Sequence, residues 1–265
     1  MNRPTRPPDR PIIINNRPIN ITNIRPGSRP WYDYHFHPWH RGYWGWWRPA
    51  GWFVGGATTG WMLAPRGPTF VFNNPFYDRS TVVFNYSQPL PPPPVDPVDD
   101  VRSVEIADAA IEIFDRARDA FRENNFREAL ALVDRAIQEL PTDATLHEFR
   151  ALCLFALRDY RGAAATLYAV LAAGPGWDWA TMHALYADTA TYTDQLRALE
   201  AYQRANPRSA EASFVLAYQY LVLGHIDTAI RQLENVVALL PESELSSQML
   251  AALRAEVNNQ APSAR

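Results

Sequence analysis

Three histidines near the start of the chain form the most metal-like cluster in the sequence. His35, His37 and His40 follow the spacing H-x-H-x-x-H in a tract rich in Trp, Tyr and Gly. Neutral imidazole nitrogens bind Zn, Cu and Ni, so this spacing can bring several ligands to one ion. The nearest carboxylate is Asp33, and no Cys lies in the tract. Two interpretations stay open: a weak metal site, or an aromatic tract with incidental histidines.

Nucleophilic catalysis has little support in this sequence. The single cysteine, Cys153, falls on an apolar helix face, where a free thiol usually packs as a small hydrophobic group. The chain contains no nucleophile elbow, no Gly-rich phosphate loop and no His-Glu zinc motif. Acidic residues such as Glu123, Glu128 and Asp134 fall on predicted helix surfaces and are expected to be solvated. We therefore expect a protein that is not an enzyme and needs no cofactor.

Residues 51–64 combine glycines with large apolar side chains. Gly51, Gly55, Gly56 and Gly60 recur at nearly four-residue spacing among Trp and Phe, a pattern that suits close helix contact and interfacial anchoring in lipid. The stretch is shorter than the ~20 apolar residues of a membrane-spanning helix. We expect peripheral membrane contact here rather than a span. The first 30 residues lack the apolar centre of a signal peptide.

The composition changes sharply near residue 100. Residues 1–99 hold 18 of the 23 prolines and 7 of the 9 tryptophans. Their formal charge is +5, while the rest of the chain carries −8. The chain contains Arg but no Lys. The Arg residues of the first part are separated by Pro and Asn rather than clustered, so we expect no nucleic-acid partner. Two physically different segments share this chain.

The second segment contains prolines at regular intervals. Pro141, Pro175, Pro207 and Pro241 are separated by 34, 32 and 34 residues. Proline ends a helix because it lacks an N–H and clashes with the preceding turn. A capping residue follows each proline, and these predicted caps are Asp143, Asp178, Ser209 and Ser243.

Aligned on these prolines, the units place similar residues at similar positions. Small residues recur where two helices of a hairpin must cross closely, and larger apolar residues recur where the next hairpin packs. The small residues are Ala117, Ala151 and Ala217 in the first helix and Ala129, Ala163 and Ala229 in the second; the larger ones are Val133, Leu167 and Leu233.

This pattern resembles the tetratricopeptide repeat family over roughly residues 104–258. The resemblance implies an all-α, right-handed superhelix of about four helical hairpins followed by a capping helix. The predicted units are 110–143, 144–177, 178–209 and 210–243, with a cap at 244–257 and a disordered tail at 259–265. The third unit is two residues short, and Gln195 lies near the place of its second small residue, so its helices, predicted at 179–191 and 194–205, are expected to cross at an altered angle.

In this family the first helix of each hairpin lines a concave groove. Carried onto this chain, the resemblance implies an aromatic groove with a basic end, suited to an extended peptide. The residues are equally consistent with a core between hairpins. No Lys is present to clamp a peptide carboxylate as in chaperone-tail binders. The predicted groove residues are Phe114, Arg118, Phe121, Arg122, Glu148, Leu152, Phe155, Trp179, Met182, Tyr186, Phe214, Tyr218 and Leu221.

The first 99 residues are predicted to form an arm without a core of its own. Residues 1–30 have too few apolar contacts to offset ordering and are expected to be disordered. Residues 69–72 and 81–86 are β-branched and aromatic, which predicts two short strands or a β-ribbon. A polyproline run at 91–94 then leads into the helices. Because the aromatics of the arm need cover, we also hypothesise that the arm folds back onto the solenoid.

The whole chain is similar to a group of bacterial repeat proteins with an Asn/Pro/Arg-rich start and a Trp/His/Gly tract. The similarity is carried by Phe84 to Pro89, by residues 146–152 and by residues 172–179 and 192–200. Some members are labelled protocadherin-like cell-surface proteins, which implies an envelope or exported location; a chain starting here without a signal would be cytoplasmic. We expect a protein-interaction scaffold, or alternatively a surface-attached structural protein or a His-tract metal binder.

Overall fold

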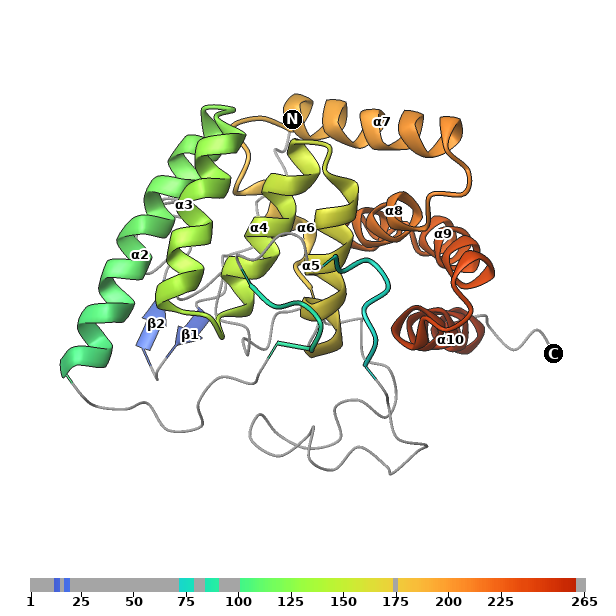
Figure 1. Cartoon of the computed structure of the whole chain (residues 1–265), viewed down its shortest axis with the longest axis horizontal. Helices are drawn as coiled ribbons and strands as arrows, with labels where there is room; N and C mark the ends of the chain where they lie inside the picture. Colours follow the sequence, from blue (N-terminus) through green and yellow to red (C-terminus); the bar gives the residue numbers. More distant parts are fainter. Residues whose placement is uncertain are drawn as a thin grey trace, which may run out of the picture.

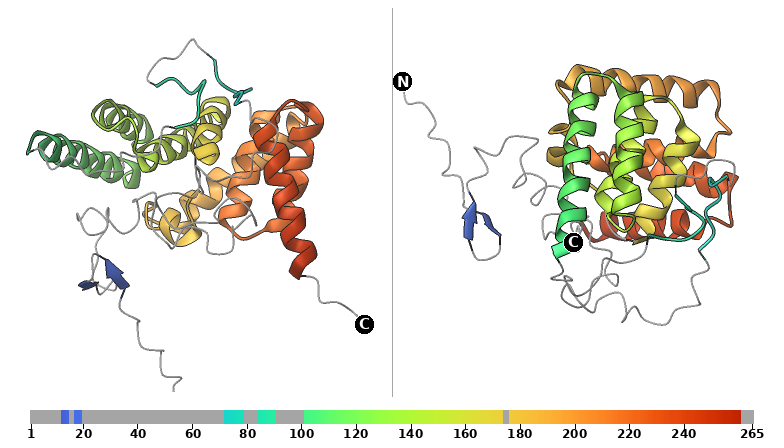
Figure 2. Two further views of the ribbon diagram at one scale, coloured as in Figure 1. Left: turned by 90° about the horizontal axis from the view of Figure 1, so that it is seen from below. Right: turned by 60° about the vertical axis from the view of Figure 1, so that its left-hand side comes forward.

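The computed structural model describes residues 12–14, 17–19, 72–78, 84–90, 101–173 and 176–260. Within these ranges the chain is mainly α-helical, and the helices form a curved array (Figure 1 and Figure 2). The prediction of an all-α solenoid is confirmed. The helices are α2 (Val101–Arg122), α3 (Phe126–Glu139), α4 (Ala144–Ala156), α5 (Tyr160–Ala173), α6 (Trp179–His183), α7 (Thr189–Ala205), α8 (Ala210–Val222), α9 (Ile226–Leu239) and α10 (Glu244–Gln260).

Two short strands lie close to the start of the chain. β1 (Ile12–Ile14) pairs antiparallel with β2 (Arg17–Ile19), with Ile12 opposite Ile19. The sequence predicted disorder across residues 1–30, and this pairing differs from that prediction because β-branched isoleucines favour an extended, paired backbone. The other residues of that stretch lie outside the described ranges.

Three hairpins follow the predicted repeat: α2–α3, α4–α5 and α8–α9, which we call the regular hairpins. In each, the two helices pack closely together. The small residues expected at the crossings are buried, and small side chains let two helices approach closely. The larger residues expected between hairpins are buried as well. These positions are Ala117, Ala129, Val133, Ala151, Ala163, Leu167, Ala217, Ala229 and Leu233.

The turn inside each regular hairpin uses one residue in the left-handed backbone region. This residue is Asn124 (φ 63°), Arg158 (φ 63°) or Gly224 (φ 76°). The following N–H donates back five residues, as from Asn125 to the Ala120 carbonyl at 2.8 Å. This is the Schellman closure of a helix end, for which Gly is the usual residue because it has no Cβ.

Helix starts follow the predicted caps in three of the four places. The Asp143, Asp178 and Ser209 side chains accept backbone N–H groups at the starts of α4, α6 and α8. The fourth, Ser243, precedes α10, and its hydroxyl instead bonds the Ser246 hydroxyl at 2.8 Å. The prolines therefore mark the boundaries between units, and capping side chains set the first residue of the next helix.

The third unit departs from the regular pattern. In place of helices at 179–191 and 194–205, α6 contains five residues and α7 begins at Thr189. The Asp188 side chain accepts the Thr191 N–H at 2.7 Å and so caps α7 earlier than the sequence predicted. Figure 1 and Figure 2 show α7 lying across the ends of α4 and α5. As a consequence, α8 packs directly against α5.

Candidate functional site

An extended segment of the arm is bound along the surface of the solenoid. It comprises residues 72–78 and 84–90, which we call the strap. Figure 1 shows the strap in teal, crossing α4 and α5. In Figure 2 (left) the strap and the segment that contains α6 lie on opposite sides of these helices. The hypothesis that the arm folds back onto the solenoid is therefore confirmed for these residues.

Asn74 fixes the first half of the strap by three hydrogen bonds. Its Nδ2 donates to the Ala165 carbonyl of α5 at 2.8 Å and to the Tyr86 carbonyl at 3.0 Å. Its Oδ1 accepts the Phe76 N–H at 3.2 Å. Asn74 is buried, so these bonds satisfy a carboxamide that would otherwise destabilise the fold. One side chain thus joins both halves of the strap to the solenoid.

Aromatic rings hold the strap between α5 and α8. The Phe76 ring lies 5.2 Å from the Phe214 ring and 5.9 Å from the Tyr168 ring, measured between centroids. Phe72 contacts Tyr168 edge-on at 5.6 Å. At the far end, the Leu90 N–H donates to the Ala169 carbonyl at 3.4 Å. Phe76 is 3% exposed, so the strap completes the core here rather than resting on it.

Tyr86 anchors the second half of the strap in a polar cluster on α4. Its hydroxyl lies 2.9 Å from His147 Nδ1, while His147 Nε2 lies 3.0 Å from the Pro141 carbonyl. A carbonyl only accepts, so Nε2 carries the proton, and Nδ1 accepts from Tyr86 when the imidazole is neutral. Burial lowers the pKa of His147 to about 4 and raises the pKa of Tyr86 to about 12.

A partly buried ion pair lies next to this cluster. Arg150 Nε donates to Asp134 Oδ1 at 2.7 Å, and its NH1 donates to the Thr166 hydroxyl at 2.9 Å. The guanidinium also lies over the Tyr86 ring, 5.5 Å from the centroid. Asp134 was expected to be solvated, but it is partly buried because it pairs with Arg150. Burial raises the pKa of its carboxyl, and Arg150 opposes that shift.

The predicted β-ribbon is wrong for the residues that the structure describes. Residues 72 and 84–86 form no strand. Asn side chains bind the backbone two residues later at both places, as in the Ser87 N–H to Asn85 Oδ1 bond at 3.0 Å. Such local bonds compete with strand pairing. Residues 69–71 and 81–83 lie outside the described ranges.

The predicted groove residues are largely inaccessible. Only Arg122 and Trp179 are partly exposed, and the others are buried. Phe121 and Tyr186 do meet, with ring centroids 5.0 Å apart, and Phe114 and Phe121 both pack against Phe149. Phe214 is not with them, because it faces the strap. A peptide reaches the buried members only if neighbouring parts of the chain move, so their role in binding stays a prediction.

Glu148, one of the predicted groove residues, instead forms a buried joint between three elements. Its Oε1 accepts the Trp177 N–H at 2.6 Å and the Tyr218 hydroxyl of α8 at 2.5 Å. A Cβ at Gly176 would lie 2.9 Å from this oxygen and 2.8 Å from the Tyr218 ring, so only Gly fits. Burial raises the pKa of Glu148 to about 8, although the bonds from Tyr218 and Trp177 oppose the shift.

The remaining predictions about chemistry fall partly outside the described residues. His35, His37 and His40 and the stretch 51–64 all lie there, so the metal and membrane hypotheses stay predictions. Among the described residues, no group of His, Cys, Asp and Glu is placed to hold a metal ion. Cys153 is buried, and burial raises the pKa of its thiol. No helix within the described ranges combines the length and hydropathy needed to cross a membrane.

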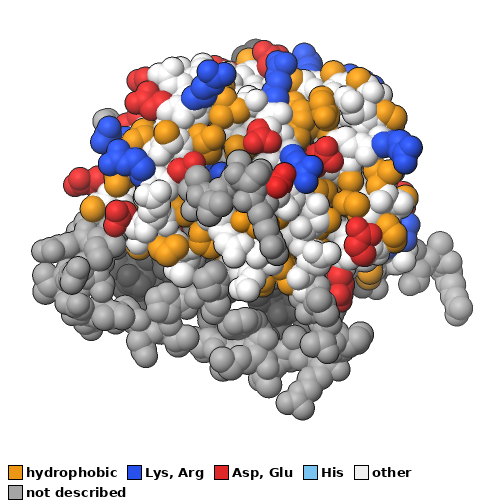
Figure 3. Space-filling model, viewed as in Figure 1, with side chains coloured by type: hydrophobic (Ala, Val, Ile, Leu, Met, Phe, Trp, Pro, Cys, Tyr) orange, Lys and Arg blue, Asp and Glu red, His pale blue; other side chains and the backbone are white. Residues whose placement is uncertain are grey.

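The face that carries the strap shows mixed charge. In Figure 3, Arg side chains and acidic side chains alternate over the described part of this face. A nucleic-acid groove instead requires a stripe of positive charge.

Comparison with known proteins agrees with the helical geometry. Residues 114–176 match the family model of the tetratricopeptide repeat. The matched stretch runs from α2 to the start of the α5–α6 connection and contains the α4–α5 hairpin that binds the strap. Tetratricopeptide repeats commonly serve as protein–protein interaction modules. No curated protein and no solved structure matches the chain.

Sequence reasoning missed the residues that bind the strap. Asn74, Phe76 and Tyr86 gave only a general signal, namely aromatic side chains beside Pro in a segment too short to bury them alone. His147 and Arg150 gave a clearer one. Both are polar and fall three residues apart on a helix whose other residues are largely apolar, and such residues need buried partners.

Proposed function

We propose that this protein is a non-catalytic scaffold that binds an extended polypeptide segment of a partner. The observation that carries the proposal is the strap. The solenoid already binds an extended chain through a buried Asn side chain, a Phe between two aromatic rings and a Tyr hydroxyl on His147. Helical repeat proteins bind their partners through the surface that the stacked helices present. The match of residues 114–176 to the tetratricopeptide repeat supports the same role for this chain.

The partner is proposed to bind the side of the solenoid that carries α6, opposite the strap, which we call the inner face. Arg122 and Trp179 are the predicted groove residues that remain partly exposed there. The Trp179 ring packs 4.9 Å from Tyr192 and 5.1 Å from His183, so it offers a pre-positioned aromatic surface. Aromatic rings give a large contact area with little loss of conformational entropy. A segment with apolar and acidic residues would complement Trp179 and Arg122.

A location in the bacterial cell envelope is part of the proposal. It is supported by the similarity of the whole chain to bacterial repeat proteins with the same Asn/Pro/Trp-rich start. Fractionation of cells that express the untagged native protein tests it. Recovery with the envelope fraction is expected, and recovery only with the cytosolic fraction would contradict this part of the proposal without touching the scaffold role.

The scaffold role is tested by site-specific photocross-linking of the full chain in its native cells. A cross-linker at position 179 is expected to capture the same protein partner in repeated experiments. The matched control is position 202, an exposed aromatic residue on α7 (Tyr202, 40% exposed). Equal capture at both positions, or none at 179, would exclude the inner face as the interaction surface.

A further inference from the structure

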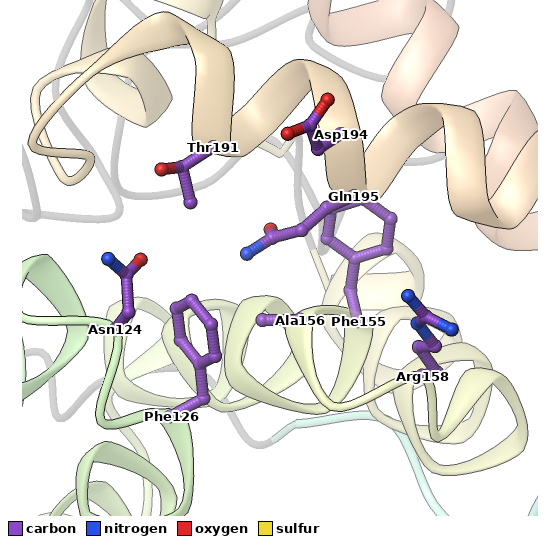
Figure 4. Close-up of a pocket in the computed structure, with 8 residues that line it drawn as sticks. All are labelled: Asn124, Phe126, Phe155, Ala156, Arg158, Thr191, Asp194 and Gln195. Atoms are coloured by element: carbon purple, nitrogen blue, oxygen red, sulfur yellow. The ribbon is translucent and has the colours of Figure 1, made fainter.

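A pocket of about 290 Å³ lies where α7 crosses the turns of the first two regular hairpins. We call it the turn pocket. Its lining comes from three places: Asn124 and Phe126 at the α2–α3 turn, Phe155 and Arg158 at the α4–α5 turn, and Asp194 and Gln195 on α7 (Figure 4). The pocket exists because the third unit leaves the regular stack. A hairpin in register would not place α7 over these turns.

Two residues of the turn pocket occupy backbone positions that favour glycine. Asn124 and Arg158 both have φ of 63°, and the equivalent residue in the α8–α9 hairpin is Gly224. That third turn does not contribute to the pocket. Non-glycine residues with left-handed backbone are uncommon, and they concentrate at functional sites. The chain thus departs from glycine at the two turns whose side chains reach the pocket.

Gln195 lines the turn pocket and carries an unpaired hydrogen-bond donor. Its Oε1 accepts the Tyr186 hydroxyl at 2.7 Å, which fixes the orientation of the carboxamide. Its Nε2 is buried and has no hydrogen-bond partner among the described residues. Figure 4 shows the carboxamide reaching into the middle of the pocket, above Ala156 and between the two phenylalanine rings. A buried, unpaired N–H group favours negative charge nearby and is satisfied by water when no ligand is bound.

Charged and aromatic groups define what kind of acceptor fits. The Arg158 guanidinium has no ion pair within the described part of the chain, and Asp194 is not within ion-pairing distance of it. Arg158 lies at one end of the pocket beside the Phe155 ring, and Phe126 forms a second apolar wall (Figure 4). The guanidinium carries five N–H donors and no acceptor. The guanidinium therefore supplies the positive charge of the pocket, next to aromatic surface, while Asp194 supplies a negative charge elsewhere in the lining.

We propose that the turn pocket binds a carboxylate attached to an apolar or aromatic group. The carboxylate accepts from the exposed Arg158 guanidinium, on the side of the pocket that holds the unpaired Gln195 Nε2, and the apolar group packs against the partly exposed Phe126. The carboxylate belongs either to a small organic acid or to an acidic side chain of a polypeptide. Asp194, at the rim, disfavours ligands of higher negative charge such as phosphates. This site does not depend on the scaffold function proposed above.

The experiment is an NMR titration of the full-length chain with 3-phenylpropionate and its neutral match, 3-phenylpropionamide. The acid is expected to bind about tenfold or more tightly than the amide, because hydrogen bonds to a charged group are stronger, and to shift the backbone amides of residues 191–195. Arg158→Gly and Gln195→Glu should each remove the preference for the acid, and Asp194→Asn should increase it. Arg161→Ala, an exposed Arg on α5, is the charge-matched control and should change nothing.

Arg158→Gly separates binding from folding, since glycine suits the left-handed backbone there, and an unchanged circular dichroism melt verifies this. A second pair, the capped dipeptides Ac-Phe-Glu-NH2 and Ac-Phe-Gln-NH2, distinguishes the two sources. Tighter binding of the Glu peptide than of 3-phenylpropionate assigns the carboxylate to a polypeptide, and the reverse assigns it to a small acid. Equal binding of acid and amide, a preference that survives Arg158→Gly, or no shift at residues 191–195 would each overturn the proposal.

Discussion

The regular hairpins and the third unit differ in the side chains that join them to their neighbours. In α2–α3, α4–α5 and α8–α9, alanines at the crossings and aliphatic residues between units make a core of apolar contacts. The third unit has a five-residue helix and a long helix that lies across its neighbours. Around it, buried polar groups do the joining: Glu148 binds Trp177 and Tyr218, and Gln195 binds Tyr186.

This difference shows how a repeat protein can gain specific sites. An apolar residue between two stacked hairpins packs well against any neighbour of suitable size. Such residues provide few polar groups that could recognise a partner. A unit that leaves the stack places polar groups next to turns and creates space between elements. In this chain the turn pocket lies at that departure, and the partly exposed Trp179 lies on α6.

The largest expected effect comes from removing the anchor that leads into the third unit. Trp177 is 0% exposed. Trp177→Ala is expected to lower the free energy of unfolding by about 3–5 kcal/mol, because a large buried ring leaves a cavity. Urea unfolding followed by circular dichroism measures it. Trp179→Ala, which truncates the partly exposed tryptophan two residues later, is the control. Similar losses in both variants would mean that the third unit is not anchored through Trp177.

The second prediction concerns the strap, which packs on the regular hairpin α4–α5. Tyr86→Phe keeps the ring but leaves His147 Nδ1 buried without its partner. We expect a loss of about 1–3 kcal/mol in the free energy of unfolding, with faster hydrogen exchange in α5. Tyr77→Phe is the matched control, because Tyr77 is partly exposed and its change should be near zero. A neutral Tyr86→Phe variant would show that the Tyr86 hydroxyl does not help to hold the strap.

Glu148 predicts a pH dependence for the joint between the second hairpin and α8. Its pKa is about 8 in the folded chain, against 4.5 for an ordinary Glu. Between these values the folded state binds a proton that the unfolded state lacks, so stability falls as pH rises from 4.5 to 8. Glu148→Gln should flatten this decline by at most about 1.4 kcal/mol per pH unit.

His147 acts in the opposite direction and serves as an internal control for that measurement. Its pKa is lowered from 6.5 to about 4, so its contribution to stability is lost as pH falls through this range. His147 is present in both proteins, and the difference between wild type and Glu148→Gln therefore isolates Glu148. Parallel pH profiles of the two proteins would contradict a buried, proton-binding carboxyl.

The smallest expected effect is at the turns inside the regular hairpins. Gly224 has φ of 76°, and an added Cβ there meets no atom within 4 Å. Gly224→Ala should therefore destabilise the chain by about 1 kcal/mol through backbone strain alone. Arg158→Gly at the corresponding turn should be neutral or slightly stabilising. Thermal melts of the two variants measure the contrast, and a clear loss with Arg158→Gly would mean that Arg158 serves the fold.

The sequence predicts the regular hairpins well because their determinants are local and periodic. Pro141 and Asp143 mark one boundary, and Ala151 and Ala163 mark one crossing, without knowledge of any distant residue. The third unit was predicted less well. Its helix boundary depends on Asp188 as a cap and on Trp177 finding Glu148, which lies 29 residues earlier. Contacts between residues so far apart in the chain carry no periodic signal.

The candidate sites show the same limit more strongly. The groove residues predicted from the family resemblance include buried ones such as Phe114 and Met182. Helical spacing alone does not distinguish a core residue from a surface residue. The strap partners lie far apart in sequence: Asn74 binds a carbonyl 91 residues away. The turn pocket depends on the path of α7 over two turns, which residue types did not predict.

The direct packing of α8 against α5 has a consequence for how the solenoid unfolds. In a linear repeat array, each unit is stabilised only by its neighbours, so a local break divides the array into independent parts. In this chain the second and fourth units touch, and Glu148 and Tyr218 join them. An opening of α6 and α7 would therefore leave the two halves thermodynamically coupled.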